Sequence, residues 1–462
     1  MNKIELNIAD SMRLAADLLA ALRFSEAESL FRRVVELDRS NFLAAHAVGI
    51  CLIEQGRNEE SLSWFDRAGM IMREEMITLS FNRGKALGEL GRTPEALSIY
   101  DNIVKMCPNH ALAYYNRGLM LMQGGDYFSA IQDFNESLRL NANNDKALFG
   151  RGFANLVLGN YKDGFRDYEF RLKDDIGTIN RPLWDGSQPL SGKTILVHGE
   201  QGHGDSIMFM RYLPMLVDRG ANVIAVLHPG VAPLAAHIDG VKIVSEDKTT
   251  WPEFDYWVRT MSLALAFGTT ENSIPPPIGI KYNNGDLGRW RKIIGNDGFF
   301  SDHFKIGLCW AGSPKSRYDA NRSVPLSALA PLFDRNHLPN IQLYSLQKDI
   351  RESDVEAFKA LDIIDLSPWL TNFYDTAHAM KCLDLVVTVD TSIAHLAGTV
   401  GIPTIVMLTA FRTYWLWIEK METSPWYPSV RLFRQKHDGN WPEVVSRVAD
   451  ELREKLTAAK AA

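Results

Sequence analysis

The spacing of apolar residues changes along the chain and divides it into two regions. In the first third, a small residue is followed four positions later by an aromatic one, at Ala27/Phe31, Ser61/Phe65, Ala96/Tyr100, Ala130/Phe134 and Gly164/Tyr168. Beyond about residue 190, short apolar runs alternate with helix-like stretches, which is typical of parallel sheets covered by helices. The pattern predicts an all-α region followed by an α/β region.

The helical region repeats with a period of 34 residues. Two glycine columns show this spacing: Gly84, Gly118 and Gly152, and then Gly91, Gly125 and Gly159. The period and its small and aromatic columns resemble the tetratricopeptide repeat over about residues 10–172. This resemblance implies antiparallel helix pairs that stack into a superhelix with a concave groove.

Three residues of the repeats are candidates for binding a protein partner in that groove. Asn82 and Asn116 share one repeat position, and Arg117 belongs to a neighbouring column. Tetratricopeptide repeats often carry Asn at this position, facing the groove. The three side chains either bind an extended acceptor peptide or form a solvated helix face, and the sequence leaves both interpretations open.

Predicted elements give the domain boundaries. We expect a repeat array over residues 1–172, a turn-rich linker over 173–192 docked through Trp184, a first lobe over 193–298 and a second lobe over 299–462. Strands are predicted at residues 194–198, 223–227, 254–258, 306–310, 341–346, 385–389 and 404–408. The two alternating halves predict two facing Rossmann-like lobes with a cleft between them. A helix over residues 442–456 is expected to close the chain and to pack across both lobes.

Composition excludes several classes of protein. The net charge of -6 argues against sequence-independent nucleic-acid binding, which needs a basic face. Four scattered cysteines favour a reducing compartment. Because the chain shows neither a signal-peptide core nor a run of about 18 apolar residues, we expect a cytoplasmic protein without a membrane span.

The strongest chemical signal lies in the second lobe. A buried strand over residues 385–389 leads into the turn Asp390-Thr391-Ser392 and a helix that carries His395. The N-terminus of such a helix favours phosphate. Lys315 and Arg322, in the loop after an earlier strand, are expected to reach the same phosphate, unless that loop is an exposed basic segment. The alternative for His395 is a histidine bonded to its own helix backbone.

In the first lobe, the loop over residues 199–205 ends in His203-Gly204-Asp205. His203 or Asp205 is a candidate general base; alternatively, Asp205 only caps the following helix. The glycine spacing does not match the dinucleotide-binding fingerprint, and residues 191–194 precede their strand and so form no P-loop. The chain has no Asp-x-Asp and no His-Glu-x-x-His, so no metal is expected.

These motifs resemble the GT-B glycosyltransferases, particularly the heptosyltransferase-like group, over about residues 190–455. Gly204-Asp205 matches the group's proposed base, the Asp390 turn with His395 matches its donor-phosphate site, and Lys315 corresponds loosely to its loop lysine. His203 departs from the heptosyltransferase pattern.

The combination with repeats is similar to bacterial repeat-containing glycosyltransferases, some of which modify flagellin with nonulosonic acids. It implies transfer of a sugar from a nucleotide-sugar, with CMP-nonulosonic acid as one candidate donor, to Ser or Thr of a protein held by the repeats. Flagellin is one candidate acceptor. The alternatives are a non-enzymatic scaffold with a decayed transferase domain, and a transferase that acts on a glycan or lipid-linked acceptor.

Overall fold

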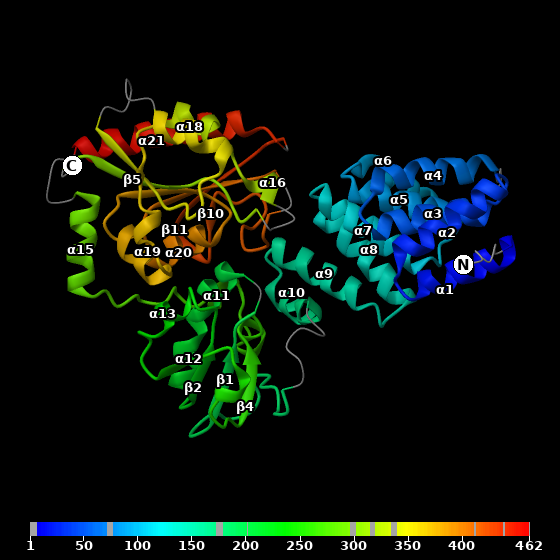
Figure 1. Ribbon diagram of the computed structural model, residues 1–462. Coiled ribbons are helices and arrows are strands. Elements are labelled where there is room, and N and C mark those ends of the chain that lie inside the picture. The colour runs from blue at the N-terminus through cyan, green and yellow to red at the C-terminus, as the bar shows by residue number, and fades with distance from the viewer. Residues whose placement is uncertain are drawn as a thin grey trace, which may run out of the picture. The chain divides into compact units, whose positions relative to one another are not determined.

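The computed structural model divides into two compact units, Met1–Ala154 and Asn155–Ala462 (Figure 1). The predicted lobe boundary at residues 296–298 and the candidate Lys315 lie outside the described residues. The structure describes residues 7–71, 77–171, 179–200, 202–295, 302–314, 319–333, 340–410, 413–437 and 439–461.

The first unit consists of helices in the described residues, and consecutive helices pack in pairs. The helices are α1 (Ile8–Ala20), α2 (Phe24–Leu37), α3 (Phe42–Glu54), α4 (Asn58–Ile71), α5 (Ile77–Glu89), α6 (Thr93–Met106), α7 (Ala111–Gln123), α8 (Tyr127–Leu140) and α9 (Asp145–Val157), whose last turn crosses into the second unit.

The glycine and aromatic columns of the sequence meet in these helix pairs. A methyl group added to Gly49, Gly84 or Gly118 would lie 2.4, 2.9 or 2.8 Å from the ring of Phe65, Tyr100 or Phe134, respectively. Because no side chain fits there, the two helices of a pair approach closely and the aromatic ring fills the space between them. The second glycine column forms the turns, where Gly91, Gly125 and Gly159 adopt φ of 75°, 84° and 81°.

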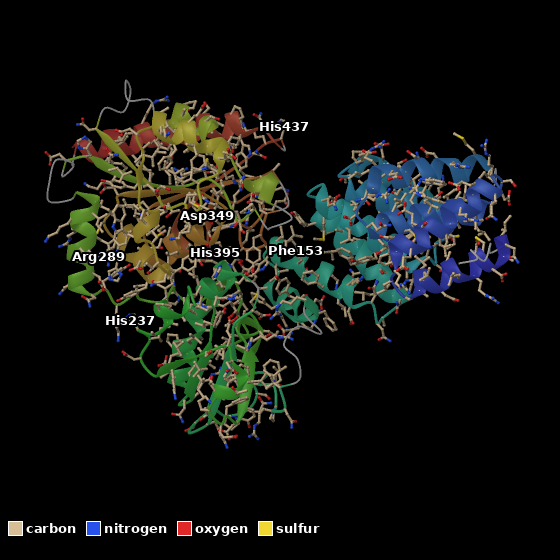
Figure 2. All side chains as sticks on the ribbon, in the orientation of Figure 1. Phe153, His237, Arg289, Asp349, His395 and His437 are labelled. Atoms are coloured by element: carbon tan, nitrogen blue, oxygen red, sulfur yellow. The ribbon has the colours of Figure 1, made fainter. Side chains whose placement is uncertain are left out.

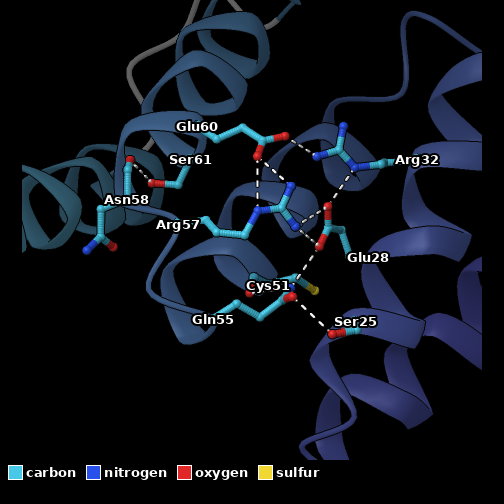
Figure 3. Close-up of polar contacts among 9 residues, drawn as sticks. All are labelled: Ser25, Glu28, Arg32, Cys51, Gln55, Arg57, Asn58, Glu60 and Ser61. Carbon is cyan, nitrogen blue, oxygen red and sulfur yellow. Dashed lines mark hydrogen bonds and ion pairs between the residues drawn. The ribbon is translucent and has the colours of Figure 1, made fainter.

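A buried carboxylate links neighbouring helices near the start of the chain (Figure 3). Glu28 accepts hydrogen bonds from Arg32 at 2.7 Å, from Arg57 at 2.8 Å and from Gln55 at 2.8 Å. Burial raises the pKa of Glu28, but hydrogen bonds from Gln55 and Arg32 and the charges of both arginines outweigh it, so the pKa falls below its ordinary value. The carboxylate therefore stays ionised and joins α2 to the turn between α3 and α4.

An arginine column ties each helix pair to its neighbours. Arg117 of α7 donates to both carboxylate oxygens of Asp133, at 2.7 Å each, and to Asp101 at 2.9 Å. Arg83 occupies the same column one repeat earlier and pairs with the exposed Asp66 at 3.2 Å. Asp133 is only 5% exposed, so its charge depends on Arg117.

The second unit contains two sheets, and the smaller one follows the predicted first lobe. Its four strands are parallel in the order β3-β2-β1-β4, with bounds Val241–Val244, Asn222–Val226, Thr194–His198 and Tyr256–Arg259. Its helices are α11 (His203–Phe209), α12 (Leu213–Asp218), α13 (Ala232–Ala235) and α14 (Leu263–Ala266). The next helix, α15 (Asn284–Ile294), lies within the predicted first lobe in sequence but contacts α19 (Phe373–Met380) of the larger sheet (Figure 1).

The helical segment after β1 is interrupted by a 3₁₀ turn, Met210–Tyr212, between α11 and α12. Pro214 explains the break, because proline lacks an N–H and its ring collides with the carbonyl four residues earlier, that of Met210.

The larger sheet has the order β10-β11-β9-β8-β5-β6-β7, and only β10 runs antiparallel to its neighbour. Figure 1 shows α18 and α21 over one face of this sheet and α19 and α20 on the other. The sequence did not predict β11, which pairs with β9 and begins next to Pro428. The strands are β5 (Phe304–Cys309), β6 (Ile341–Ser345), β7 (Ile364–Asp365), β8 (Leu385–Val389), β9 (Thr404–Leu408), β10 (Thr423–Ser424) and β11 (Tyr427–Arg434). The helices are α16 (Asp319–Arg322), α17 (Leu326–Leu329), α18 (Val355–Ala360), α19 (Phe373–Met380), α20 (Ser392–Val400) and α21 (Trp441–Ala461).

The closing helix α21 packs on the larger sheet and not, as expected, across both lobes. Val444, Val448 and Leu452 share one apolar core with Ile306 and Leu385 of the sheet. The buried apolar side chains of α21 therefore pack on the larger sheet.

The helix that ends the predicted repeats, α10 (Tyr161–Tyr168), belongs to the second unit. Its Tyr161 and Phe165 form edge contacts with Trp415 and Trp426, with ring centroids 5.5–6.4 Å apart. Both tryptophans are fully buried. Trp184 of the predicted linker is also buried and donates its ring N–H to the carbonyl of Gln188.

We predict that Arg117→Met lowers the free energy of unfolding of the first unit by about 3 kcal/mol, because it leaves the carboxylate of Asp133 buried without its partner. Urea unfolding with hydrogen exchange in α7 and α8 measures the change. The control Arg83→Met removes an exposed ion pair in the same column and should cost less than about 1 kcal/mol. Equal losses in the two variants would contradict the prediction.

Candidate functional site

A cavity of about 770 Å³ lies where the two sheets of the second unit face each other. Its lining residues come from the segments that follow β1, β2, β5, β6, β7, β8 and β9. The carboxyl ends of parallel strands are the usual position of ligand sites in α/β proteins, because helix N-termini and loops converge there. The cavity gathers seven of the eight residues that the sequence predicted for catalysis and donor binding: His203, Asp205, Arg322, Asp390, Thr391, Ser392 and His395.

The two sheets meet through α11 and α20, which are in direct contact. A methyl group on Gly204 of α11 would lie 2.7 Å from Cδ2 of His395 on α20. Only glycine leaves room for the imidazole ring at this point. Figure 2 shows His395 at the level where α20 faces α11.

His395 is buried, and its Nδ1 lies 3.2 Å from the hydroxyl of Tyr427. Burial lowers the pKa of His395 to about 4, although the charge of Asp390 opposes this change. The imidazole is therefore neutral near pH 7 and has its ring oriented by Tyr427. Its bond partner is a side chain of another element and not the helix backbone, which was the alternative interpretation.

Asp205 is half-buried and has two hydrogen-bond donors. Tyr414 donates its hydroxyl to Oδ1 at 2.5 Å, and the backbone N–H of Gly202 donates to Oδ2 at 3.0 Å. Burial raises the pKa of Asp205 to about 6, while these two hydrogen bonds oppose the rise. A carboxyl group with such a pKa is suited to general-base chemistry near neutral pH. By accepting from the N-cap residue Gly202, Asp205 also caps the N-terminus of α11. Its roles as a helix cap and as a candidate general base are therefore compatible.

His203 lies at the edge of the cavity. Its ring centroid is 5.1 Å from that of His228 and 5.4 Å from that of Phe373. Partial burial of the ring and the neighbouring His228 lower the pKa of His203, although the residue as a whole is exposed. The side chain is exposed, so it is the more accessible of the two candidate bases, and Asp205 is the more tightly held.

The carboxylate of Asp390 is already bound by protein groups. The indole N–H of Trp417 donates to Oδ1 at 2.8 Å, and the backbone N–H of Tyr414 donates to Oδ2 at 3.3 Å. The geometry assigns Asp390 to holding the loop of residues 413–418.

The N-cap residue of α20 does not cap this helix with its side chain. Thr391 is its N-cap residue but makes no side-chain capping bond, because its hydroxyl lies 3.3 Å from that of Thr388. Ser392, half-buried, lines the cavity at the first turn. The hydroxyl of Thr391 therefore contacts β8 instead of capping α20, and a helix N-terminus without such a cap can bind an anion.

Arg322 is the predicted donor-site cation that the structure describes. Its Nη1 donates to the backbone carbonyl of Asp390 at 2.9 Å. A methyl group on Gly312 would lie 2.4 Å from Nη2 of this arginine, so glycine lets the guanidinium lie along the loop. The guanidinium thus lines the cavity next to the turn before α20.

The three candidate groove residues have partners inside the repeats. The amide of Asn82 lies 3.0 Å from Nε2 of the buried His46, and that of Asn116 donates to the carbonyl of Leu112 at 3.1 Å. Arg117 forms the ion pairs described above. Acceptor binding through these residues remains a prediction, and their contacts also give them a structural role.

Several cavity residues were not singled out from the sequence. Gln347 accepts from the backbone N–H of Ala311 at 3.1 Å, and Lys348 donates to the carbonyl of Leu370 at 2.9 Å. Arg351 pairs with Asp319 across the cavity edge. Their position directly after β6 was the available signal, because residues at that end of a parallel strand converge on the site.

Comparison with known proteins identifies the repeats. The tetratricopeptide repeat family matches residues 12–69 and 81–145, so the predicted repeats are confirmed over these residues. The chain is 28% identical over 299 residues to "Protein FlbA" of Caulobacter vibrioides, an alignment that covers 59% of this chain and 48% of that protein. The chain thus spans about half the length of this relative. The first unit holds only 154 of the 462 residues, so the likeness extends into the second unit.

Solved structures similar to the chain include a tetratricopeptide repeat protein from Parabacteroides merdae, at 25% identity, covering 35% of this chain and 64% of that one, with a TM-score of 0.31. MamA from Desulfovibrio magneticus is similar at 18% identity, covering 36% of this chain and 90% of that one, also with a TM-score of 0.31.

None of the helices in the described residues combines the length and the apolar character that a membrane span requires.

We predict that Gly204→Ala lowers the free energy of unfolding of the second unit by about 1–3 kcal/mol, since the added methyl group overlaps the ring of His395. Thermal unfolding of the full chain measures the change. Gly279→Ala is the matched control, because a methyl group there meets no atom within 4 Å. A melting temperature equal to that of the control would show that α11 and α20 do not approach as described.

Proposed function

We propose that this protein is a GT-B-type O-glycosyltransferase that transfers a sugar from a nucleotide-sugar to Ser or Thr of a protein bound by its repeats. One observation carries the proposal: Asp205, on the helix after β1 of the smaller sheet, and the N-terminus of α20, after β8 of the larger sheet, line the same cavity. A transferase of this type needs a base for the acceptor on one side and an anion site for the leaving group on the other.

The donor side is supported by groups that favour a phosphate. The N-terminus of α20 offers backbone N–H groups and the positive end of the helix dipole. Arg322 adds a charge beside it. His395 is neutral and would act as a hydrogen-bond donor through Nε2 when Nδ1 accepts from Tyr427. The carboxylate of Asp390 contributes by holding the loop of residues 413–418.

The proposed step transfers one proton and one sugar. The acceptor hydroxyl oxygen forms a bond to the anomeric carbon of the donor as the bond from that carbon to the phosphate oxygen breaks. Asp205 takes the hydroxyl proton, and the nucleotide leaves with its negative charge, stabilised by α20 and Arg322.

The repeats support a protein acceptor, because stacked tetratricopeptide units present an extended surface for peptides. Flagellin is the candidate acceptor that the sequence resemblance suggests, and CMP-nonulosonic acid is the candidate donor. The position of α10 affects how recruitment is tested: a chain that begins near residue 191 would lack α10 and would uncover Trp415 and Trp426. Substitutions in the full-length chain avoid this damage.

The direct test incubates the full-length protein with a panel of nucleotide-sugars that includes CMP-nonulosonic acid, and follows binding by calorimetry. Transfer is then read from the mass of purified flagellin. We expect one donor to bind and the mass of the acceptor to rise by one sugar or more. If no nucleotide-sugar binds, the second unit is better explained as a scaffold. Donor binding with sugar found only on a glycan or lipid-linked acceptor would replace the protein acceptor.

We predict that Asp205→Asn lowers the rate of transfer by about 10²–10⁴-fold while donor binding is retained, because the amide cannot take the proton. In the unaltered protein the rate should fall as the pH drops below about 6, where Asp205 becomes protonated. A pH–rate profile measures both effects. The exposed Asp239, changed to Asn, is the control and should leave the profile unchanged. Full activity of Asp205→Asn would remove this residue from the mechanism.

A further inference from the structure

The loop of residues 413–418 connects two of the acidic groups that line the cavity, Asp205 and Asp390. Tyr414 uses its backbone N–H for the carboxylate of Asp390 and its hydroxyl for the carboxylate of Asp205. Trp417 adds a second bond to Asp390. The two aspartates follow strands of different sheets, so one residue, Tyr414, fixes the position of each relative to the other.

The direction of the bond to Asp205 is determined by chemistry. An ordinary tyrosine has a pKa near 10, and burial together with the charge of Asp205 raises the pKa of Tyr414 further. The phenol therefore keeps its proton and donates it to Oδ1. The charges that raise the pKa of Asp205 come from Glu200 and Asp390, and His203 and His395 are titratable side chains of the same cavity. Tyr414 is thus the side-chain donor that favours the ionised form of Asp205.

The same loop is held from behind by α10. Trp415, the residue after Tyr414, is fully buried, and its ring centroid lies 5.5 Å from that of Phe165 and 6.4 Å from those of Tyr161 and Tyr168. Rigid aromatic neighbours on one side leave Tyr414 little freedom to turn away from Asp205.

We propose that Tyr414 is a positioning residue that orients Asp205 and keeps it ready to accept a proton, and that α10 supports it by packing against Trp415. The inference rests on the proposed function for the role of Asp205 as a base. It also extends that function, because α10 ends the predicted repeat array, which is proposed to bind the acceptor.

The test is the titration of Asp205 in the full-length protein with and without the hydroxyl of residue 414. The chain is labelled with ¹³C at its aspartate carboxyl carbons, and the Asp205 resonance is identified by its loss in Asp205→Asn. In Tyr414→Phe we expect the midpoint of the Asp205 titration to rise by about one pH unit, since a hydrogen bond to the ionised form is lost. The acid limb of the pH–rate profile of transfer should move by the same amount.

The control is Tyr161→Phe, which removes a hydroxyl from the same aromatic cluster, where it accepts from Trp426 and does not reach Asp205. Its titration and its profile should match those of the unaltered protein. An unchanged Asp205 midpoint in Tyr414→Phe, or an equal shift in the control, overturns the positioning role. A shifted midpoint in a protein that transfers no sugar would support the role of Tyr414 and reject only the proposed function.

Discussion

The close approach of α11 to α20 is the constraint on which the second unit depends. It requires a residue without a side chain at Gly204 and a planar ring at His395, and it brings the carboxyl ends of two parallel sheets to one cavity. Were the helices a few ångströms further apart, Asp205 would lose its link to Tyr414 and the N-terminus of α20 would no longer share a cavity with it.

Burial then gives the polar groups in this cavity their chemical character. It raises the pKa of Asp205 towards neutrality and keeps His395 uncharged, so one group is suited to accept a proton and the other to donate a hydrogen bond. Asp390 carries the same functional group as Asp205, and each carboxylate accepts from one side chain and one backbone N–H. Tyr414 contributes a donor to both, so the two carboxylates are held by one loop.

The repeats follow a simpler rule. A glycine on one helix and an aromatic ring on the next recur every 34 residues, and the close contact between them sets how each pair of helices packs. Arg117 shows the limit of reading function from such a column: its position suggested a binding residue, and its charge is used to hold the buried Asp133. A repeated polar position supports stacking as readily as recognition.

The sequence by itself determined the repeats, the positions of most strands along the chain and the motifs around Asp205 and His395, because periodicity, turn chemistry and strand–helix alternation are local properties. The tertiary structure alone decided which residues are partners. Tyr414 lies 209 residues from Asp205 along the chain, and no local pattern links them. It also decided that α10 packs with the second unit and that β11 joins the sheet beside Pro428, because both depend on apolar surfaces and strand edges that exist only once the chain has folded.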